Sequence, residues 1–420
     1  MEIIKTICKI IYYSIDIFIL LYAAYYVVTG VFVFFNKRNS KIRSYRAKHK
    51  IAIIIAARNE GKVIGHLLDS LNKQKYPKSL YEIFVVPNNC TDNTEEVAIQ
   101  KGAKIIECQG CIKSKGDALK YTFKFMEQNY PEYDAYAIFD ADNIVHPNYL
   151  RRMNDALCSG FKVAQGYRDS KNPSDTWISS CYSLFYWIQN YFFNQARMNM
   201  GWSASINGTG FIVSKEVIKK NGFNTVTLTE DIEFAAQCAL NNEKIAFVKD
   251  AITYDEQPLG FVQSWKQRTR WSIGTIQCLK KYSPKLMKTA FKEKIPQAFD
   301  MSLFFLAPIF QILSTLIIVM LSVYNALDIQ VSDMIKTLYD NKIFSVVLGY
   351  IISVALATFV VIIEKKKIKN TVKGILTLSI FMLTWVPINI VCCIKKEHVW
   401  EPIEHNRTVD IDSIVEINTK

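Results

Sequence analysis

The sequence predicts an α/β domain, built on a mostly parallel sheet, that is joined to membrane helices. Three observations predict this fold class. Short apolar runs alternate with helical patterns between residues 51 and 140, four long apolar runs lie outside that region, and basic residues gather beside the long runs. The chain has 420 residues, half of them hydrophobic, which is enough for two or three domains with a sizeable core.

The four long apolar runs cover residues 10–35, 301–327, 344–363 and 374–394. About 20 apolar residues span a bilayer, so we expect a transmembrane anchor in residues 1–36 and transmembrane or re-entrant helices in residues 300–396. The last run has basic residues at both ends and Pro387 near its middle. Both a re-entrant hairpin and a simple span fit it, and the re-entrant form would leave a tail of residues 397–420 in the cytosol.

The net charge of +13 is concentrated in three stretches: 37–50, 280–294 and 365–373. They hold seven, six and five basic residues and a single acidic residue. Their combined charge is larger than the net charge of the whole chain. Each stretch adjoins a long apolar run, as in the cytoplasmic loops of membrane proteins. The charge therefore predicts a multi-pass protein of the cell membrane, with its catalytic domain in the cytosol and no nucleic-acid partner.

The alternating region predicts the catalytic domain, expected at residues 45–257. We expect strands at 51–57, 81–86, 104–108 and 135–140, and helices at 60–71, 92–102 and 115–130. Such alternation favours right-handed crossovers and a mostly parallel sheet, in which ligands bind beyond the carboxyl ends of the strands. Polar clusters lie at those ends. Residues 258–295 follow as amphipathic helices of the membrane interface.

The first motif is Asp140-Ala141-Asp142, directly after an apolar strand. Two carboxylates that leave a strand together can bind Mg²⁺ or Mn²⁺ with the phosphates of a substrate. The triplet alone is weak, because Asp410-Ile411-Asp412 repeats it in the polar tail. Its position at the end of a buried strand distinguishes the first from the second.

The second motif, Thr229-Glu230-Asp231, opens a helical run. It fits a helix start, with Thr229 as the cap and the acids favoured by the helix dipole. Taken alone, the motif favours this helix start, and the alternative is a general base beside a metal site. A glycine-rich turn, Asn207-Gly208-Thr209-Gly210, precedes it and would let a ligand approach the backbone closely.

The third motif places Gln267, Arg270 and Trp271 on one helix face, since they are three and four residues apart. Sugar rings stack on tryptophan, and arginine binds phosphate oxygens. A belt of arginine and tryptophan at the membrane surface is the alternative.

The order and spacing of these motifs resemble the processive family 2 glycosyltransferases, which include cellulose, mixed-linkage β-glucan, hyaluronan and poly-N-acetylglucosamine synthases. The resemblance covers residues 45–285 and the membrane layout. It implies a GT-A type domain and inverting transfer from a UDP-sugar. In that family the second strand usually ends in aspartates that bind uracil. Here Asp92 is kept, but Asn88 stands where an aspartate is expected.

The resemblance implies a role for each motif. Asp231 matches the catalytic base, with Glu230 and Thr229 beside it, and Asp140 and Asp142 match the metal-binding acids. The residues expected at the nucleotide sugar are Arg58, Glu60, Asn88, Asp92, Lys115 and Asp140. Those expected at the acceptor and the diphosphate are Asn207, Gly208, Thr209, Gly210, Gln267, Arg270 and Trp271.

The function predicted from the sequence is that of a hexosyltransferase that polymerises a UDP-sugar, UDP-glucose by preference, into a β-linked polysaccharide and extrudes it. Its partners are the donor, the growing polysaccharide and the bilayer, with accessory export subunits left open. Polymerisation of UDP-N-acetylglucosamine and transfer of one sugar to a lipid carrier remain alternatives. A transporter or channel with a nucleotide-binding domain is the alternative outside enzymology.

Overall fold

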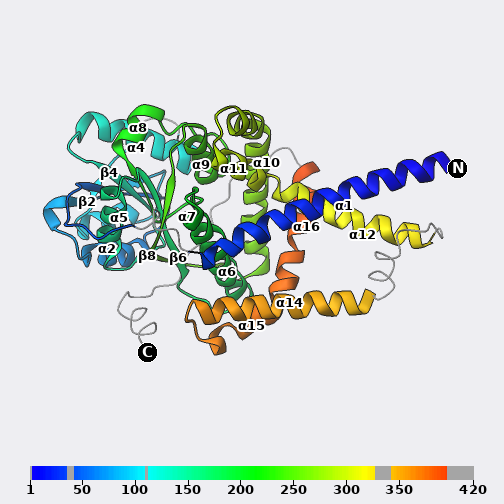
Figure 1. The fold of residues 1–420 in the computed structure, drawn as a ribbon. Coiled ribbons are helices and arrows are strands. Elements are labelled where there is room, and N and C mark those ends of the chain that lie inside the picture. The colour runs from blue at the N-terminus through cyan, green and yellow to red at the C-terminus, as the bar shows by residue number, and fades with distance from the viewer. Residues whose placement is uncertain (1, 36–41, 109–111, 327–341, 395–420) are drawn as a thin grey trace.

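The computed structural model describes residues 2–35, 42–108, 112–326 and 342–394 (Figure 1). A sheet domain lies at one end of the molecule, and long helices extend from the other. The predicted tail, 397–420, lies outside the described residues. The predicted α/β fold class is confirmed.

The first half of the sheet is parallel. Strand β1 (Ile51–Ala57) lies between β2 (Tyr81–Pro87) and β4 (Ala135–Asp140), and β3 (Lys104–Ile105) extends the edge beyond β2. Most side chains of β1 are buried, as expected for a central parallel strand that reads as one continuous apolar run. The register brings the carboxyl ends of β1, β2 and β4 to one edge.

The second half makes the sheet mixed. Strand β7 (Phe211–Ser214) runs antiparallel to both β4 and β6 (Val163–Ser170). Strand β6 then pairs in parallel with β8 (Ile245–Asp255), and the short β5 (Ile144–Val145) closes the order β3-β2-β1-β4-β7-β6-β8-β5. The antiparallel β7 brings the glycine-rich turn that precedes it beside the end of β4.

Helices complete the sheet domain, and one-turn helices occur at Phe32–Phe34 (η1) and Lys78–Leu80 (η3). The longer ones are α2 (Ile64–Asn72), α3 (Thr94–Gln100), α4 (Lys115–Asn129), α5 (Tyr149–Cys158), α8 (Lys215–Asn221) and α9 (Glu230–Leu240). Their apolar faces and the strands form one buried core.

A middle layer separates the sheet from the apolar helices. It contains α6 (Trp177–Ile188), the π-helical η4 (Gln189–Gln195), α7 (Ala196–Met200) and the long α10 (Phe261–Lys292). Helix α10 contacts α9 on the sheet side and α11 and α16 on the other. The layer therefore joins the two halves of the molecule.

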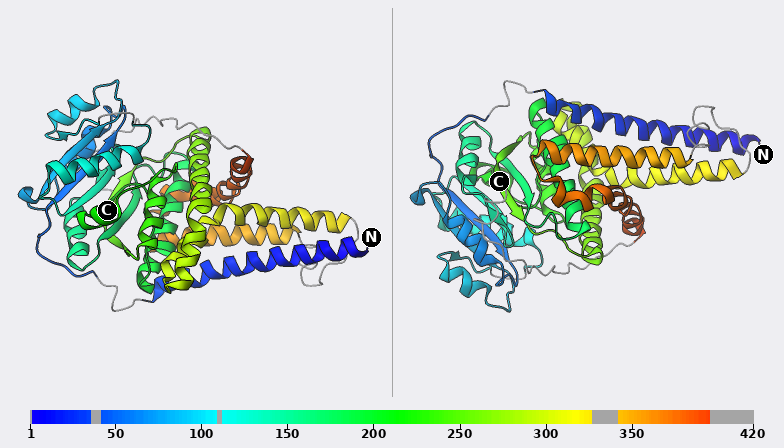
Figure 2. Two further views of the ribbon diagram at one scale, coloured as in Figure 1. Left: turned by 90° about the horizontal axis from the view of Figure 1, so that it is seen from above. Right: turned by 90° about the horizontal axis from the view of Figure 1, so that it is seen from below.

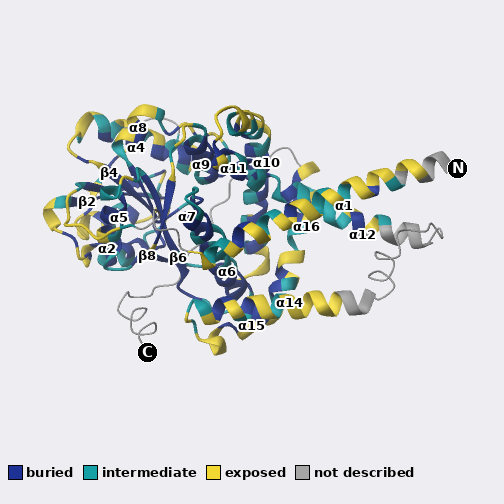
Figure 3. Cartoon of the chain, in the orientation of Figure 1, coloured by how far each residue is buried: buried dark blue, intermediate teal, exposed yellow. Residues whose placement is uncertain are grey.

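The apolar helices are α1 (Glu2–Val31), α11 (Pro296–Phe305), α12 (Ala307–Ala326), α14 (Lys342–Ile363), α15 (Ile368–Leu383) and α16 (Trp385–Ile394). Helices α1, α12 and α14 extend away from the sheet in one direction (Figure 2). Much of the apolar surface of α1 and α14 is exposed (Figure 3). Among the described residues, three helices are long and apolar enough to cross a membrane, or four if the bent pair α11 and α12 forms one span. This indicates association with a membrane.

A buried ion pair joins the middle layer to α11, and a tyrosine hydroxyl from α1 bonds to it. The guanidinium of Arg197 in α7 donates to both carboxylate oxygens of Asp300 in α11, at 2.7 and 2.8 Å. The hydroxyl of Tyr25 in α1 donates to the same carboxylate at 2.7 Å. Because both charged side chains are almost fully buried, neither can exchange its partner for water.

We predict that Asp300→Leu lowers stability by about 3–5 kcal/mol, because it leaves the buried Arg197 charge without its partner. The double variant Arg197→Met/Asp300→Leu removes both charges and should recover most of that loss. Thermal unfolding in detergent measures both. The matched control is Glu216→Ala, which breaks the exposed pair with Lys162 and should barely move the midpoint. A single variant as stable as the parent would contradict the prediction.

Candidate active site

A cavity of about 450 Å³ begins where the parallel strands end. On the sheet side its walls include the ends of β1, β4, β6 and β8 and the starts of α4 and α9. It passes the side chains of α10 and continues to residues of α11, α12, α15 and α16. One cavity thus runs from the sheet edge to the apolar helices.

Asp140 and Asp142 line the cavity at the end of β4. The backbone N–H of Asp140 donates to the hydroxyl of Thr209 at 3.0 Å, which fixes the strand end against the glycine-rich turn. Asp142 is almost buried, and its carboxylate accepts a long hydrogen bond from the backbone of Glu256 at 3.4 Å. The chain therefore presents two carboxylates to one space.

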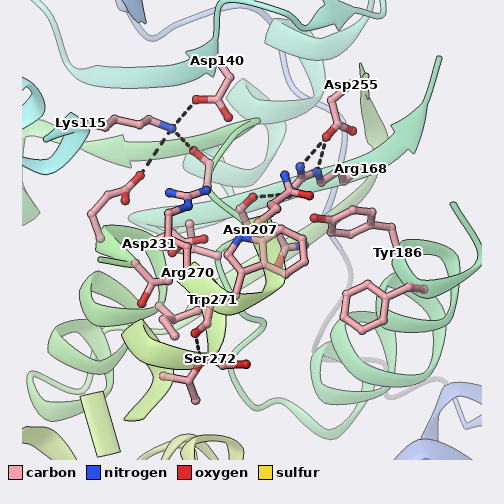
Figure 4. Close-up of a pocket in the computed structure, with 18 of the residues that line it drawn as sticks. Lys115, Asp140, Arg168, Tyr186, Asn207, Asp231, Asp255, Arg270, Trp271 and Ser272 are labelled. Atoms are coloured by element: carbon pink, nitrogen blue, oxygen red, sulfur yellow. Dashed lines mark hydrogen bonds and ion pairs between the residues drawn. The ribbon is translucent and has the colours of Figure 1, made fainter. Parts of the chain in front are cut away.

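Lys115 connects three of the predicted motifs (Figure 4). Its ammonium lies 2.5 Å from Asp140 Oδ1, 2.7 Å from the carbonyl oxygen of Gly208 and 3.6 Å from Glu230 Oε1. Burial alone would lower the pKa of Lys115, but the Asp140 and Glu230 carboxylates outweigh it and raise that pKa. The side chain therefore stays charged. Ser114 caps the helix that Lys115 begins, in a reciprocal bond with Asp117.

Thr229, Glu230 and Asp231 all line the cavity at the start of α9. Thr229 occupies the cap position, but its hydroxyl makes no capping bond and has no partner among the described residues. Burial raises the pKa of Asp231 to about 6, and the neighbouring Glu230 carboxylate also raises it. A carboxylate with such a pKa is ionised at neutral pH and can accept a proton.

The glycine-rich turn lies against Asp231. Gly208 has a φ of 82°, and a side chain there would approach the Asp231 carboxylate at 3.3 Å. Asn207 and Gly208 line the cavity, and the amide nitrogen of Asn207 has no partner within the described part of the chain. Thr209 and Gly210, which were also expected at the acceptor, are not among the lining residues: Thr209 is buried and bonds to the Asp140 N–H, and the Gly210 carbonyl accepts from Gly166.

Gln267, Arg270 and Trp271 line the middle of the cavity from α10. The Trp271 ring meets Tyr186 edge-on at 6.4 Å and lies nearly parallel to the Trp385 ring at 6.3 Å. The Arg270 charge lowers the pKa of Asp231 against the effect of burial. The predicted helix face is therefore turned toward the predicted base, and not only toward the membrane surface.

Of the residues expected at the nucleotide, Arg58, Glu60 and Asn88 line the cavity. Asp92 is not among the lining residues. Its carboxylate accepts from the backbone of Thr94 at 3.1 Å and of Gly61 at 2.9 Å. These bonds fasten the loop after β2 to the loop after β1, so in this structure Asp92 shapes the loop.

The sequence did not single out Arg168, Asp255 or Tyr186, and all three line the cavity. Arg168 donates from Nε to Asp255 at 2.9 Å and from Nη1 to the Asn207 carbonyl at 2.7 Å, and its guanidinium lies 4.0 Å from the Tyr186 ring centre. Burial raises the pKa of Asp255 to about 6, although Arg168 lowers it. The sequence feature that could have pointed to Arg168 and Asp255 is the position of a charged residue near the end of β6 and at the end of β8.

The acidic side chains of the cavity suit a divalent cation that also binds a diphosphate. Among the described residues, no three His, Cys, Asp or Glu side chains are grouped as a complete metal cage. Asp140 and Asp142 supply two hard oxygen ligands on the cavity wall. Magnesium-type ions are commonly held by one or two carboxylates with substrate phosphates and water, so the residues present fit such an ion.

Comparison with known proteins gives the family. The model described as "Glycosyltransferase like family 2" matches residues 49–274, more than half of the chain. The probable glycosyltransferase YdaM of Bacillus subtilis is 28% identical over 268 residues, 61% of this chain and 61% of its own length. The beta-monoglucosyldiacylglycerol synthase of Synechocystis is 25% identical over 236 residues, 54% of this chain and 48% of its own length. The chain therefore matches about half to three fifths of these relatives.

A solved structure supports the fold. The mannosyltransferase PcManGT of Pyrobaculum calidifontis, in complex with GDP-Man and Mn²⁺, superimposes with a TM-score of 0.56 and 16% identity. The match covers 89% of this chain and 98% of that one, so it includes the apolar helices as well as the sheet domain. At this identity the likeness establishes a shared fold.

Gly274 offers a test of how closely α10 packs on α9. Alanine normally stabilises a helix over glycine by about 0.5–1 kcal/mol. A Cβ at Gly274, however, would lie 2.3–2.8 Å from the Thr229 side chain, and overpacking costs about 1–3 kcal/mol. We predict that Gly274→Ala lowers the thermal midpoint. Gly349→Ala in α14 meets nothing within 4 Å and should not lower it. Equal shifts of the same sign would contradict the packing.

Proposed function

The chain belongs to glycosyltransferase family 2, and from that membership we propose that it transfers one glucose from UDP-glucose to the hydroxyl group of a membrane lipid. The observation that carries the proposal is the single cavity that joins the carboxylates of the sheet edge to the apolar helices. A soluble nucleotide sugar can enter at one end and a lipid at the other.

The expected synthesis of a polysaccharide is less well supported than this alternative. The Synechocystis relative is named for making a monoglucosyl lipid, and the 4,4'-diaponeurosporenoate glycosyltransferase of Staphylococcus aureus, 37% identical over 79 residues, is also named for a single non-polymeric acceptor. Neither name describes a polymer. The motif Gln267, Arg270 and Trp271, on which the processive prediction depended, is equally suited to hold the sugar and diphosphate during one transfer.

In the proposed mechanism Asp231 accepts the proton of the lipid hydroxyl. The hydroxyl oxygen then attacks the anomeric carbon of the glucose from the face opposite the diphosphate. The new carbon–oxygen bond forms as the bond to the diphosphate breaks, so the configuration inverts and UDP leaves. Arg270 and Lys115 line the same cavity, and in this mechanism their charges stabilise the departing diphosphate.

A Mg²⁺ or Mn²⁺ ion bound by Asp140 and Asp142 would supply further positive charge to the diphosphate oxygens. The residues of the chain supply the rest. Trp271 offers a flat surface for the glucose ring, Asn207 and Thr229 offer unpartnered polar atoms for its hydroxyls, and Asn88 offers an amide for the nucleoside.

The test of the function uses the full chain purified into nanodiscs that contain diacylglycerol. UDP-[³H]glucose, UDP-[³H]N-acetylglucosamine and GDP-[³H]mannose are supplied separately with Mn²⁺ or Mg²⁺, and the lipids are separated and weighed by mass spectrometry. We expect one lipid product, larger by one hexose, from UDP-glucose. A long product that cellulase or lichenase degrades would overturn the proposal in favour of polymerisation. Incorporation of label from another donor would change the sugar that is assigned to the reaction.

The pKa of Asp231 predicts the pH dependence. The base must be ionised to accept a proton, so we expect the rate to be level above pH 6 and to fall about tenfold per pH unit below it. Asp231→Asn should slow transfer by about 10²–10⁴-fold and remove that acid limb, while the KM for UDP-glucose stays within about twofold. Asp69→Asn, which breaks an exposed pair with Lys101, is the control. An Asp231→Asn protein with near-normal turnover would exclude Asp231 as the base.

A further inference from the structure

Two cations hold the glycine-rich turn through consecutive peptide groups (Figure 4). The carbonyl oxygen of Asn207 accepts a hydrogen bond from Nη1 of Arg168 at 2.7 Å. The next carbonyl, that of Gly208, accepts from the ammonium of Lys115 at 2.7 Å. Hydrogen bonds from a charged donor are stronger than those between neutral groups. The turn is therefore fixed by charged side chains from two different elements, β6 and α4.

Asp255 in turn holds the side chain of Arg168. Its carboxylate accepts from Nε of Arg168 at 2.9 Å and from Nη2 on the same oxygen. The side chain of Asp255 is 4% exposed and that of Arg168 is 11% exposed, so the two groups have little water with which to exchange their bonds. The guanidinium also lies over the Tyr186 ring, 4.0 Å from its centre. Its planar fork thus bonds to a carboxylate and to a peptide carbonyl at once.

The strand that carries Arg168 is fixed on its other face. Successive side chains of a strand point to opposite faces, and Arg168 lines the cavity whereas its two neighbours do not. The hydroxyl of Tyr167 donates to Glu364 at 2.7 Å, and Lys366 donates to Asp169 at 2.5 Å. The register of β6 against β8 also shifts just before Tyr167, and such irregularities re-aim side chains. Both neighbours of Arg168 are therefore bonded to the loop after α14, which sets the direction of Arg168.

The turn that Arg168 holds lies against the expected base. A Cβ at Gly208 would lie 3.3 Å from Oδ2 of Asp231, so the backbone of the turn is close to that carboxylate. Asn207, whose carbonyl Arg168 fixes, is the residue directly before Gly208. A displacement of about 1 Å at a reacting group can slow a reaction by about 10²-fold. A side chain that fixes the turn can therefore affect the rate without contacting a substrate.

We propose that Arg168 is a positioning residue of the glycosyl transfer. Anchored by Asp255, its guanidinium fixes the Asn207 carbonyl and keeps the glycine-rich turn against the Asp231 carboxylate. The role is one of geometry, because an ammonium at this position would keep the charge but not the planar fork that reaches both partners. The inference deepens the proposed function and rests on it for the role of Asp231 as the base.

The test measures transfer by variants of the full chain in nanodiscs that contain diacylglycerol. Arg168→Ala removes the bonds to both partners. We expect it to lower kcat by about 10²-fold while the KM for UDP-glucose stays within about twofold. Millimolar guanidinium chloride should restore kcat about tenfold, because the free ion can bond to Asp255 and the Asn207 carbonyl. Ethylammonium chloride, which brings the charge without the fork, should restore much less.

A second variant keeps the test informative if Arg168→Ala does not fold. Arg168→Met/Asp255→Leu replaces a buried ion pair by apolar side chains, which is often neutral for stability. It should lose as much activity at an unchanged thermal midpoint, and guanidinium should not restore it, because the carboxylate that would hold the ion is gone. Lys104→Ala, which breaks an exposed ion pair with Glu82, is the matched control. It should leave kcat unchanged with or without guanidinium.

Three results would overturn the inference. They are a double variant with the kcat of the parent, equal rescue of Arg168→Ala by the two ions, and a loss confined to the KM for UDP-glucose. The last would mean that Arg168 binds the donor and does not position the turn. A parent protein that makes a labelled polymer, or no labelled lipid, would instead overturn the proposed function. That failure is seen before any variant is compared, so the two are distinguishable.

Discussion

The ammonium of Lys115 holds the site together. It bonds to Asp140 at the end of β4 and to the Gly208 carbonyl before β7, and it forms an ion pair with Glu230 at the start of α9. Without that cation, the carboxylates of Asp140, Glu230 and Asp231 would share a poorly solvated cavity with strong mutual repulsion. With it, the three acids can lie close together. This one partly buried cation therefore joins α4, the glycine-rich turn and α9.

Helix α10 connects the start of α9 with the apolar helices. Its Lys281 and Tyr282 bond to the buried Glu233 of α9, at 2.9 and 2.7 Å, and these bonds lower the pKa of Glu233 although burial alone would raise it. Further along the helix, Gly274 lets Thr229 approach, and Arg268 satisfies the carbonyl at the break before α16. A single helix thus sets both the start of α9 and the position of the interrupted helix.

The sequence predicted the structure correctly wherever the residues that determine an element are close together in the chain. An apolar run such as 51–57 buries both faces, so its strand could be placed almost to the residue, and the acids after 135–140 followed from the strand. Arg168 and Asp255 could not be paired in advance, because 87 positions separate them and only the alignment of β6 with β8 brings them together. Asp92 shows the opposite difficulty: an acid after a strand has the same sequence pattern whether it binds a ligand or fixes a loop.

The charge distribution along the cavity separates the two proposed substrates. Lys115, Arg168 and Arg270 line the part of the cavity nearer the sheet, whereas its lining residues from α11, α12, α15 and α16, such as Gln311 and Asn389, are uncharged. A charged donor would be favoured among these three cations, because burying phosphates without compensating charge is costly. A neutral alcohol would gain little at the strand ends, where Lys115 and Arg168 already form ion pairs with carboxylates. Under the proposed function, each substrate would therefore have one favourable end of the cavity.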